Sequence, residues 1–115
     1  MTASPTIVVL TGSNSGLGYE TVKSLLASSV PYKIYCGARS LDKAQKTVDS
    51  LSSAKKPADI LVPLVLDVSS DESIAAATKT VAEADGRVDV LINNAGKYNG
   101  PSRWPRSGHV FAGLS

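Results

Sequence analysis

The chain is poor in the residues that cross-link proteins or bind metals. Its 115 residues include one cysteine, one histidine, one tryptophan and one phenylalanine. The lone Cys36 cannot form an internal disulfide, and its place in an apolar run predicts a buried thiol. His109 has no cysteine, carboxylate or second histidine at ligand spacing, so we expect a solvated histidine and no metal site.

Strong net charge and long apolar runs are also missing. Twelve basic and ten acidic residues give a formal net charge of +2, too small to indicate nucleic acid or an anionic membrane surface as a partner. No apolar run approaches the roughly 20 residues that span a bilayer, and residues 1–5 do not resemble a secretory signal. We therefore expect one modest cytoplasmic domain with no nucleic-acid or membrane partner.

Short apolar runs alternate with helical periodicity in the order β-α-β-α-β-α-β. This order predicts an α/β fold with a parallel sheet and helices on both faces. The expected strands are residues 6–11, 32–37, 60–66 and 88–92. The expected apolar helix faces are Leu17, Thr21, Leu25 and Leu26 in the first helix, Leu41, Ala44, Val48 and Leu51 in the second, and Ile74, Ala77, Val81 and Ala84 in the third.

Local signals mark the ends of these elements. Ser40 is expected to cap the second helix, residues 69–72 match the S-x-x-E capping box before the third, and Gly86 is expected to close it. Pro63 cannot donate a hydrogen bond to a sheet, which predicts that residues 60–66 form an edge strand. The doubly wound strand order 3-2-1-4 puts the third strand at the edge, in agreement with this prediction.

A glycine-rich stretch follows the first strand. Residues 11–18 are Thr-Gly-Ser-Asn-Ser-Gly-Leu-Gly, and they open a helical pattern. Glycines allow positive φ and close approach of the backbone to a phosphate, while a helix N-terminus offers N–H groups to negative charge. The stretch therefore predicts a cradle for the pyrophosphate of a dinucleotide.

The glycine spacing T-G-x-x-x-G-x-G resembles the signature of the short-chain dehydrogenase/reductase family. Residues 93–96, Asn-Asn-Ala-Gly, resemble the motif that ends the family's fourth strand, and Asp67-Val68 resembles its adenine-bordering pair. The resemblance covers residues 6–96 and leans toward the carbonyl-reductase-like or retinol-dehydrogenase-like branches. It implies that residues 1–96 are the N-terminal half of an NADP-binding Rossmann domain, a partial doubly wound fold of four parallel strands.

The resemblance also implies which residues contact the cofactor. The glycine loop would surround the pyrophosphate, the pair after the third strand would border the adenine, and the residues after the fourth strand would border the ribose. In that order these residues are Gly12, Asn14, Ser15, Gly16, Leu17 and Gly18, then Asp67 and Val68, then Asn94, Ala95 and Gly96. Structural alternatives stay open: Gly16 and Gly18 for helix packing, Asp67 for a strand-end turn and Asn94 for tying strands together.

Residues 37–40, Gly-Ala-Arg-Ser, indicate which cofactor is preferred. In such folds an acidic residue about 20 positions beyond the glycine loop binds the ribose 2′-hydroxyl, whereas an arginine accommodates a 2′-phosphate. No acid is present here, and a guanidinium can offer a phosphate two parallel hydrogen bonds. Arg39 and Ser40 therefore predict NADP(H), with a solvated Arg39 before a helix as the alternative.

The family resemblance implies hydride transfer to or from a carbonyl or alcohol carbon. That chemistry uses a serine, a helix asparagine and a Y-x-x-x-K pair that lie beyond the N-N-A-G motif. Residues 97–115 hold no such segment, so we expect no catalytic residue and a chain truncated before the catalytic part. The literal Tyr19-x-x-x-Lys23 lies in the helix after the glycine loop and is interpreted as an ordinary helical pair.

Residues 97–115 contain no acidic residue and no periodicity, which predicts an irregular, disordered tail. A truncated or frame-shifted product, a splice variant and an incorrect gene model would all give such a tail. The alternative to a disordered tail is a binding segment around Trp104. With such a tail, residues 88–92 would form an exposed edge open to self-association or a partner chain. Two functions stay open: an inactive NADP(H)-binding module derived from a short-chain oxidoreductase, or a non-enzymatic interaction protein or fragment.

Overall fold

The computed structural model describes residues 5–13, 16–93 and 110–113. In this part of the chain strands and helices alternate, as the sequence predicts, and one further strand follows. The elements are β1 (Thr6–Leu10), α1 (Gly16–Ala27), β2 (Tyr32–Ala38), α2 (Leu41–Leu51), a 3₁₀ turn (Ser52–Ala54), β3 (Ile60–Val65), α3 (Asp71–Asp85), β4 (Val90–Asn93) and β5 (Val110–Gly113).

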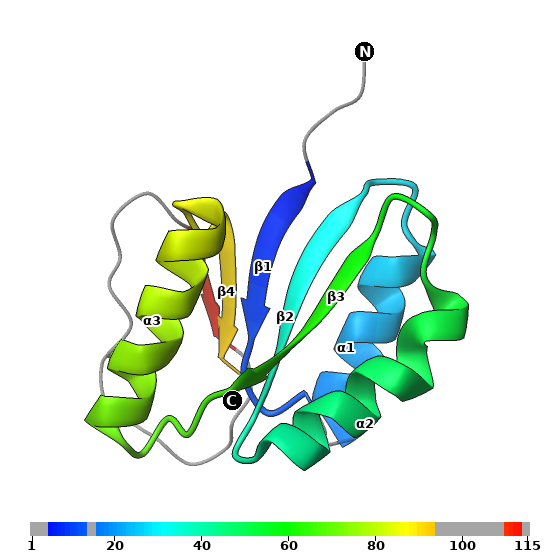
Figure 1. Cartoon of the computed structure of the whole chain (residues 1–115). Helices are drawn as coiled ribbons and strands as arrows, with labels where there is room; N and C mark the ends of the chain where they lie inside the picture. The colour runs from blue at the N-terminus through cyan, green and yellow to red at the C-terminus, as the bar shows by residue number, and fades with distance from the viewer. Residues whose placement is uncertain (1–4, 14–15, 94–109, 114–115) are drawn as a thin grey trace.

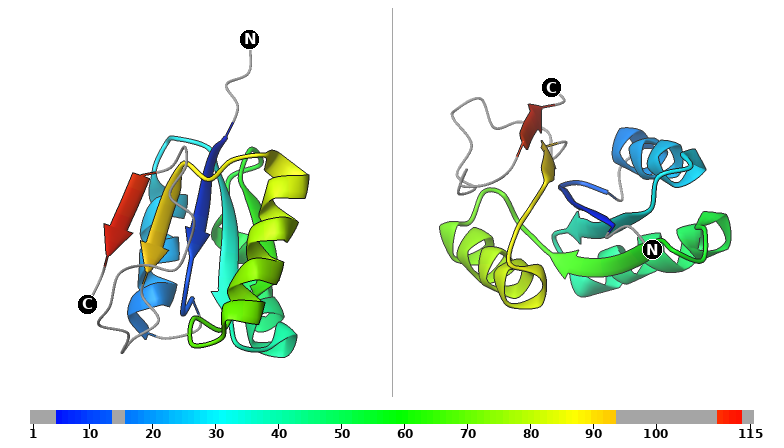
Figure 2. Two further views of the ribbon diagram at one scale, coloured as in Figure 1. Left: turned by 90° about the vertical axis from the view of Figure 1, so that its left-hand side faces the viewer. Right: turned by 90° about the horizontal axis from the view of Figure 1, so that it is seen from above.

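All strands are parallel and form one sheet in the order β3-β2-β1-β4-β5. Helices α1 and α2 cover one face of the sheet and α3 covers the other (Figures 1 and 2). The predicted α/β class and the strand order 3-2-1-4 are therefore confirmed. Chain connections that place helices on both faces require strands apolar on both sides, which is why β1 is an uninterrupted apolar run.

The side chains of β1 divide alternately between two hydrophobic cores. Val8 and Leu10 pack toward α1 and α2, together with Ile34 of the neighbouring strand. Ile7 and Val9 pack on the opposite face, under α3. Side chains that alternate between the two faces are typical of a strand. Both faces of β1 are therefore apolar, and helices cover both of them.

The buried faces of the helices differ in part from the predicted ones. In α1 the buried residues are Gly18, Val22 and Leu26, spaced four apart, whereas Leu17 is 58% exposed. The first-turn residue Leu41 of α2 is similarly 57% exposed. The predicted faces also wrongly included Ala84, which is exposed on α3; Thr21, Leu25 and Val48 are partly buried, and the latter two pack against the core beneath α1 and α2.

The helix ends follow the predicted chemistry, with one correction. The hydroxyl of Ser40 caps α2 by accepting from the N–H of Lys43 at 3.3 Å. Gly86 ends α3 with φ 73°, a left-handed conformation that favours glycine. The cap of α3 is Ser70, not Ser69 as the S-x-x-E pattern predicted, because the Ser69 hydroxyl donates to Asp67 instead.

The edge position predicted for the proline-containing strand is confirmed. Strand β3 lies at one end of the sheet, and Pro63 stands opposite Cys36 in the register with β2. The missing N–H of Pro63 therefore costs the sheet no internal hydrogen bond. Cys36 is fully buried, as predicted, and burial raises the pKa of its thiol to about 12.

The other end of the sheet differs from the prediction. Strand β5 pairs in parallel with β4, so β4 is an internal strand and not the exposed edge expected from the sequence. Residues 110–113 are thus a strand within a segment predicted to be irregular. Their pairing satisfies the backbone groups of β4 that would otherwise invite another chain. Among the described residues, no helix is long and apolar enough to cross a membrane.

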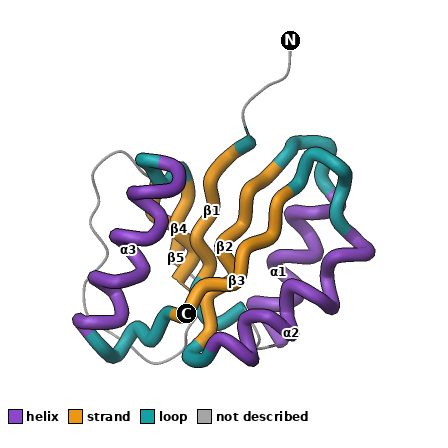
Figure 3. The backbone as a smooth tube through the Cα atoms, in the orientation of Figure 1, coloured by secondary structure: helices purple, strands orange, loops and turns teal. Residues whose placement is uncertain are grey.

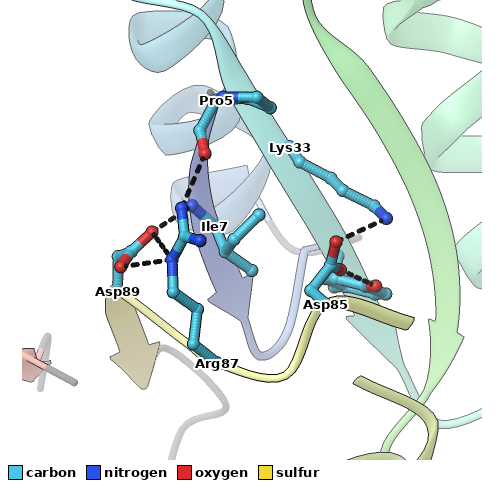
Figure 4. Close-up of polar contacts among 7 residues, drawn as sticks. Pro5, Ile7, Lys33, Asp85, Arg87 and Asp89 are labelled. Carbon is cyan, nitrogen blue, oxygen red and sulfur yellow. Dashed lines mark hydrogen bonds and ion pairs between the residues drawn. The ribbon is translucent and has the colours of Figure 1, made fainter. Parts of the chain in front are cut away.

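Two aspartates near the amino ends of the strands hold the sheet and α3 together (Figure 4). Asp89 accepts the N–H of Ile7 at 2.8 Å and pairs with Arg87 at 3.0 Å. Asp85, at the end of α3, pairs with Lys33 at 3.0 Å and accepts the hydroxyl of the buried Tyr35. These contacts join β1, β2 and α3 at the amino edge of the sheet, which is the edge opposite the glycine loop.

These aspartates predict a loss of stability in acid. Burial alone would raise the pKa of Asp85 and Asp89, but their hydrogen bonds and cationic partners outweigh burial and lower it; Asp59 behaves in the same way. A pKa below the unfolded value of about 3.9 stabilises the fold above that pH. We expect an unchanged melting temperature from about pH 7 to 5 and a steep fall below about pH 4, measured by circular dichroism. A flat profile down to pH 3 would contradict this prediction.

Candidate functional site

The carboxyl ends of the strands meet at one edge of the sheet, the lower edge in Figures 1 and 3. Strand β1 leads into α1 on one face, whereas the neighbouring β4 is reached from α3 on the other. The strand order therefore runs from β1 through β2 to β3 in one direction and resumes at β4 on the other side of β1. In open α/β sheets a ligand crevice forms at this kind of topological switch point.

The glycine loop begins at this edge and is fixed by the neighbouring strands. Gly12 has φ 65°, a conformation that few residues other than glycine adopt. The N–H and hydroxyl of the buried Ser13 both donate to the carbonyl of Gly37, at 2.9 and 3.0 Å. The N–H of Thr11 donates to the carbonyl of Ile92 at 3.0 Å. The loop is thus anchored to β2 and β4 before α1 begins.

The glycines at the start of α1 differ in what the protein requires of them. A Cβ placed on Gly16 would meet no described atom within 4 Å. Packing within the described protein therefore does not require glycine there, and the space beside it suits a close-approaching ligand. Gly18 is buried in the face of α1 that packs on the sheet, which favours the packing alternative for that residue. Leu17, between them, extends outward.

Gly37 is a site-positioning residue that the sequence analysis did not identify. A Cβ there would lie 2.8 Å from the carbonyl oxygen of Leu10, closer than real Cβ contacts allow. Glycine thus lets β1 and β2 approach, and its carbonyl holds Ser13 in the glycine loop. The available signal was a glycine at the end of the apolar stretch of residues 34–36, because a glycine within a strand often marks close backbone approach.

Arg39 and Ser40 follow β2 directly, and both are exposed. The Ser40 oxygen accepts the N–H of Lys43, so its hydroxyl proton remains available to an acceptor outside the helix. The free N–H groups of the first turn of α2 lie at the same place. A guanidinium, a hydroxyl donor and a helix N-terminus thus come together at the end of β2, a combination suited to an anion.

Asp67 and Val68 follow β3, next to the end of β2. The hydroxyl and N–H of Ser69 donate to the Asp67 carboxylate at 2.6 and 3.0 Å. These bonds, with the positive charge of Arg39, lower the pKa of Asp67. Asp67 is thus a strand-end turn residue, as the structural alternative expected, and it is also charged beside Arg39. Val68 packs against the core under α3.

Part of the predicted site lies outside the described residues. This applies to Asn14, Ser15, Asn94, Ala95 and Gly96, and to His109 and Trp104. Asn93, which begins the N-N-A-G motif, is the last residue of β4. The motif therefore starts at the carboxyl edge of the sheet, beside the strand that carries the glycine loop.

The literal Y-x-x-x-K sequence of α1 is not arranged as a catalytic pair. The hydroxyl of Tyr19 bonds to Ser50 of α2 at 2.6 Å, and Lys23 pairs with Glu20 at 3.8 Å. Each side chain therefore has its own partner, so the two residues form neither a catalytic pair nor the helical pair that the sequence suggested. Over the described ranges, no cluster of three histidine, cysteine or acidic residues could hold a metal ion.

Comparisons with known proteins give one matching family and several similar sequences. The short chain dehydrogenase family matches residues 6–106. Over 90 residues the chain is 46% identical to the short-chain dehydrogenase anuI of Penicillium roqueforti, covering 78% of this chain and 34% of that protein. It is 42% identical over 92 residues to the short-chain dehydrogenase/reductase eupG of a Phoma species, covering 78% and 33%.

Solved structures show the same fold over most of the described residues. The L-sorbose reductase of Gluconobacter frateurii, complexed with NADPH and L-sorbose, aligns with a TM-score of 0.68 and 26% identity over 82% of this chain and 34% of that chain. A variant of actinorhodin polyketide ketoreductase with NADPH aligns with a TM-score of 0.68 and 30% identity, covering 87% and 37%. The chain spans about a third of the length of the relatives it matches.

Proposed function

The chain belongs to the short-chain dehydrogenase family, and we propose that its 115 residues bind NADP(H) at the carboxyl edge of the sheet without themselves carrying out hydride transfer. The observation that carries this proposal is the open space at Gly16. A glycine that packing among the described residues does not require, at the start of a helix and beside a loop with positive φ, suits close approach of a pyrophosphate.

The residues of this edge fit the parts of a dinucleotide in order. Gly12 and Gly16 would border the pyrophosphate, with the N–H groups of α1 directed at its charge. The exposed Leu17 would cover one side of the bound cofactor. Asp67 and Val68 would border the adenine, since they follow the strand beyond β2. The residues after Asn93 would border the ribose of the nicotinamide half.

Arg39 and Ser40 support NADP(H) over NAD(H). A carboxylate at the end of β2 would repel a 2′-phosphate, whereas here a guanidinium and a hydroxyl donor flank a helix N-terminus. Two structural neighbours carry NADPH in their crystals, which supports the same cofactor class. The bound cofactor would supply a nicotinamide ring that gives or takes hydride at a carbonyl or alcohol carbon.

The proposal separates binding from catalysis because the described residues offer no proton donor at the switch point. Tyr19 bonds to Ser50 on the α2 side of α1, and Lys23 pairs with Glu20 of the same helix. A general acid must reach the reacting oxygen within hydrogen-bonding distance, and a residue held on the α2 side of α1 does not meet that condition. The interaction-protein alternative assigned its binding edge to β4, which is paired with β5, so that alternative would need the outer edge of β5 instead.

The proposal predicts a nucleotide preference that a single charge reverses. We expect the 115-residue chain to bind NADPH about tenfold more tightly than NADH in a calorimetric titration, because only NADPH has the anion that Arg39 can pair with. Arg39→Asp places a carboxylate beside that anion and should remove or reverse the preference. The variant should keep its melting temperature, since Arg39 is exposed.

Lys46→Asp is the matched control for charge. Lys46 is an exposed residue in the middle of α2, away from the end of β2, so this change should leave the preference within about twofold. Equal binding of NADH and NADPH by the unmutated chain would contradict the proposed cofactor. Sustained NADPH oxidation with ketones or aldehydes that disappears in Tyr19→Phe would contradict the separation of binding from catalysis.

A further inference from the structure

Arg39 and Asp67 leave neighbouring strands side by side. The N–H of Leu66 donates to the carbonyl of Ala38 at 2.8 Å, so the next residue of each strand emerges next to the other. Both belong to the edge that the proposed function assigns to the adenosine half of the cofactor. A cation and an anion therefore share the rim of the proposed nucleotide site.

The carboxylate of Asp67 is held in place by its own turn. Both hydrogen bonds from Ser69 end on Oδ1, and the backbone N–H of Asp67 donates to the hydroxyl of Ser73 at 2.8 Å. The Ser69 bonds and the charge of Arg39 lower the pKa of Asp67, so the side chain is ionised at neutral pH. In the described part of the chain no residue donates a hydrogen bond to Oδ2. A fixed negative charge thus stands beside the arginine.

Further charged groups stand at the starts of α2 and α3, at the same edge. The first turn of α2 contributes one acid and one base, Asp42 and Lys43, both exposed. Their opposite charges offset each other, whereas Asp71 and Glu72 in the first turn of α3 add to the negative charge of Asp67 and oppose Arg39 and the N-terminus of α2. The net field that meets a 2′-phosphate is therefore weaker than a lone arginine would produce.

We propose, resting on the nucleotide site proposed above, that Asp67 is a specificity-determining residue whose negative charge offsets Arg39 and keeps the preference for a 2′-phosphate moderate. Such a phosphate carries about 1.5 to 2 negative charges at neutral pH, so it is attracted by Arg39 and repelled by Asp67. A 2′-hydroxyl is uncharged and experiences neither effect to the same degree. The charge of Asp67 therefore changes the ratio of the NADPH affinity to the NADH affinity.

The test is Asp67→Asn, titrated with NADPH and NADH at low and at near-physiological salt. Asparagine preserves the shape and the Oδ1 acceptor for Ser69 but removes the charge. Contacts with the adenine change equally for both nucleotides and cancel in the ratio. We expect the affinity ratio to rise about three- to tenfold at low salt and by less at about 0.15 M, because salt screens exposed charges.

Two further variants keep the result interpretable. Ser69→Ala loosens the Asp67 turn but keeps the charge, so the ratio should stay within about twofold of the unmutated value. In an Arg39→Gln background, Asp67→Asn should still raise the ratio, because its repulsion acts directly on the phosphate.

The outcomes separate this inference from the proposed function. An unchanged or lower ratio in Asp67→Asn, while the unmutated chain still prefers NADPH, would overturn the role of Asp67 and leave the nucleotide site standing. A rise of equal size at both salt concentrations would overturn the electrostatic cause. An unmutated chain that binds neither nucleotide would overturn both proposals together.

Discussion

Replacing Asp59 with alanine should lower the free energy of unfolding by about 3 to 5 kcal/mol. The Asp59 side chain is fully buried and ionised, and it accepts the N–H groups of Tyr32 at 2.9 Å and Lys56 at 3.0 Å. It also pairs with the Lys56 ammonium at 2.9 Å. Alanine would leave two N–H groups without their acceptor and a partly buried ammonium without its counter-charge.

The position of Asp59 explains why the effect should be global. Tyr32 begins β2, and the Lys56 ammonium also donates to the carbonyl of Leu26 near the end of α1, at 2.9 Å. One carboxylate thus joins the loop before β3 to the start of β2 and, through Lys56, to α1. Loss of these bonds should destabilise all three elements together and keep the unfolding transition cooperative.

The measurement is urea unfolding followed by circular dichroism, with Asp49→Ala as the matched control. Asp49 is an exposed aspartate of α2 whose side chain accepts one hydrogen bond, from Gln45 at 2.9 Å. Its removal should change the free energy of unfolding by less than about 0.5 kcal/mol. A change of similar small size in Asp59→Ala would show that the buried cluster around Asp59 contributes little.

The sequence could predict the sheet because each strand carries its own local signal. An uninterrupted apolar run such as residues 7–10 fits only a strand covered on both faces, and Pro63 fits only an edge. Helix caps were also predictable, because Ser40 acts through its own side chain and Gly86 through its own backbone conformation. The choice between Ser69 and Ser70 was not, since it depends on Asp67 drawing the Ser69 hydroxyl away.

Features that depend on contacts between distant residues could not be predicted. Asp59 lies in a stretch that the sequence presents only as a polar loop, and its role depends on Tyr32, 27 residues away. Helix periodicity gives a face but not its limits, so Leu17 and Leu41 were wrongly counted as buried. Strand β5 is four residues long and lies far along the chain from β4, and no alternating sequence pattern predicts it.

The candidate site was predictable where backbone geometry demands a particular residue type. Positive φ at Gly12 is a requirement that a glycine pattern expresses directly. At Gly16 the described residues impose no such requirement, so the motif predicted a glycine whose reason would be a ligand. The position of Arg39 at the carboxyl edge of the sheet could likewise be predicted, because Arg39 directly follows a predicted strand. Its proximity to Asp67 required the register between β2 and β3, which no residue pattern specifies.

Replacing Gly16 with valine should weaken NADPH binding about ten- to a hundredfold while leaving the fold intact. A Cβ there would meet no described atom within 4 Å, so packing of the described residues does not oppose a larger residue. Valine is also no worse than glycine in a helix, so the melting temperature should stay the same or rise slightly. A bound pyrophosphate, however, would be pushed away from the N–H groups of α1, losing at least one charge-assisted hydrogen bond.

Gly86→Ala is the opposite control. Gly86 has φ 73° and ends α3 at the far edge of the sheet from the glycine loop, so alanine should cost about 1 to 2 kcal/mol of stability through left-handed strain. NADPH binding should be unchanged at temperatures where the variant is folded, because the nucleotide edge is untouched (Figure 1). The two variants therefore distinguish a glycine that leaves space for a ligand from a glycine that the backbone conformation requires. Tight NADPH binding by Gly16→Val would mean that the pyrophosphate does not approach α1, and the proposed site would have to be abandoned even if the chain binds the nucleotide elsewhere.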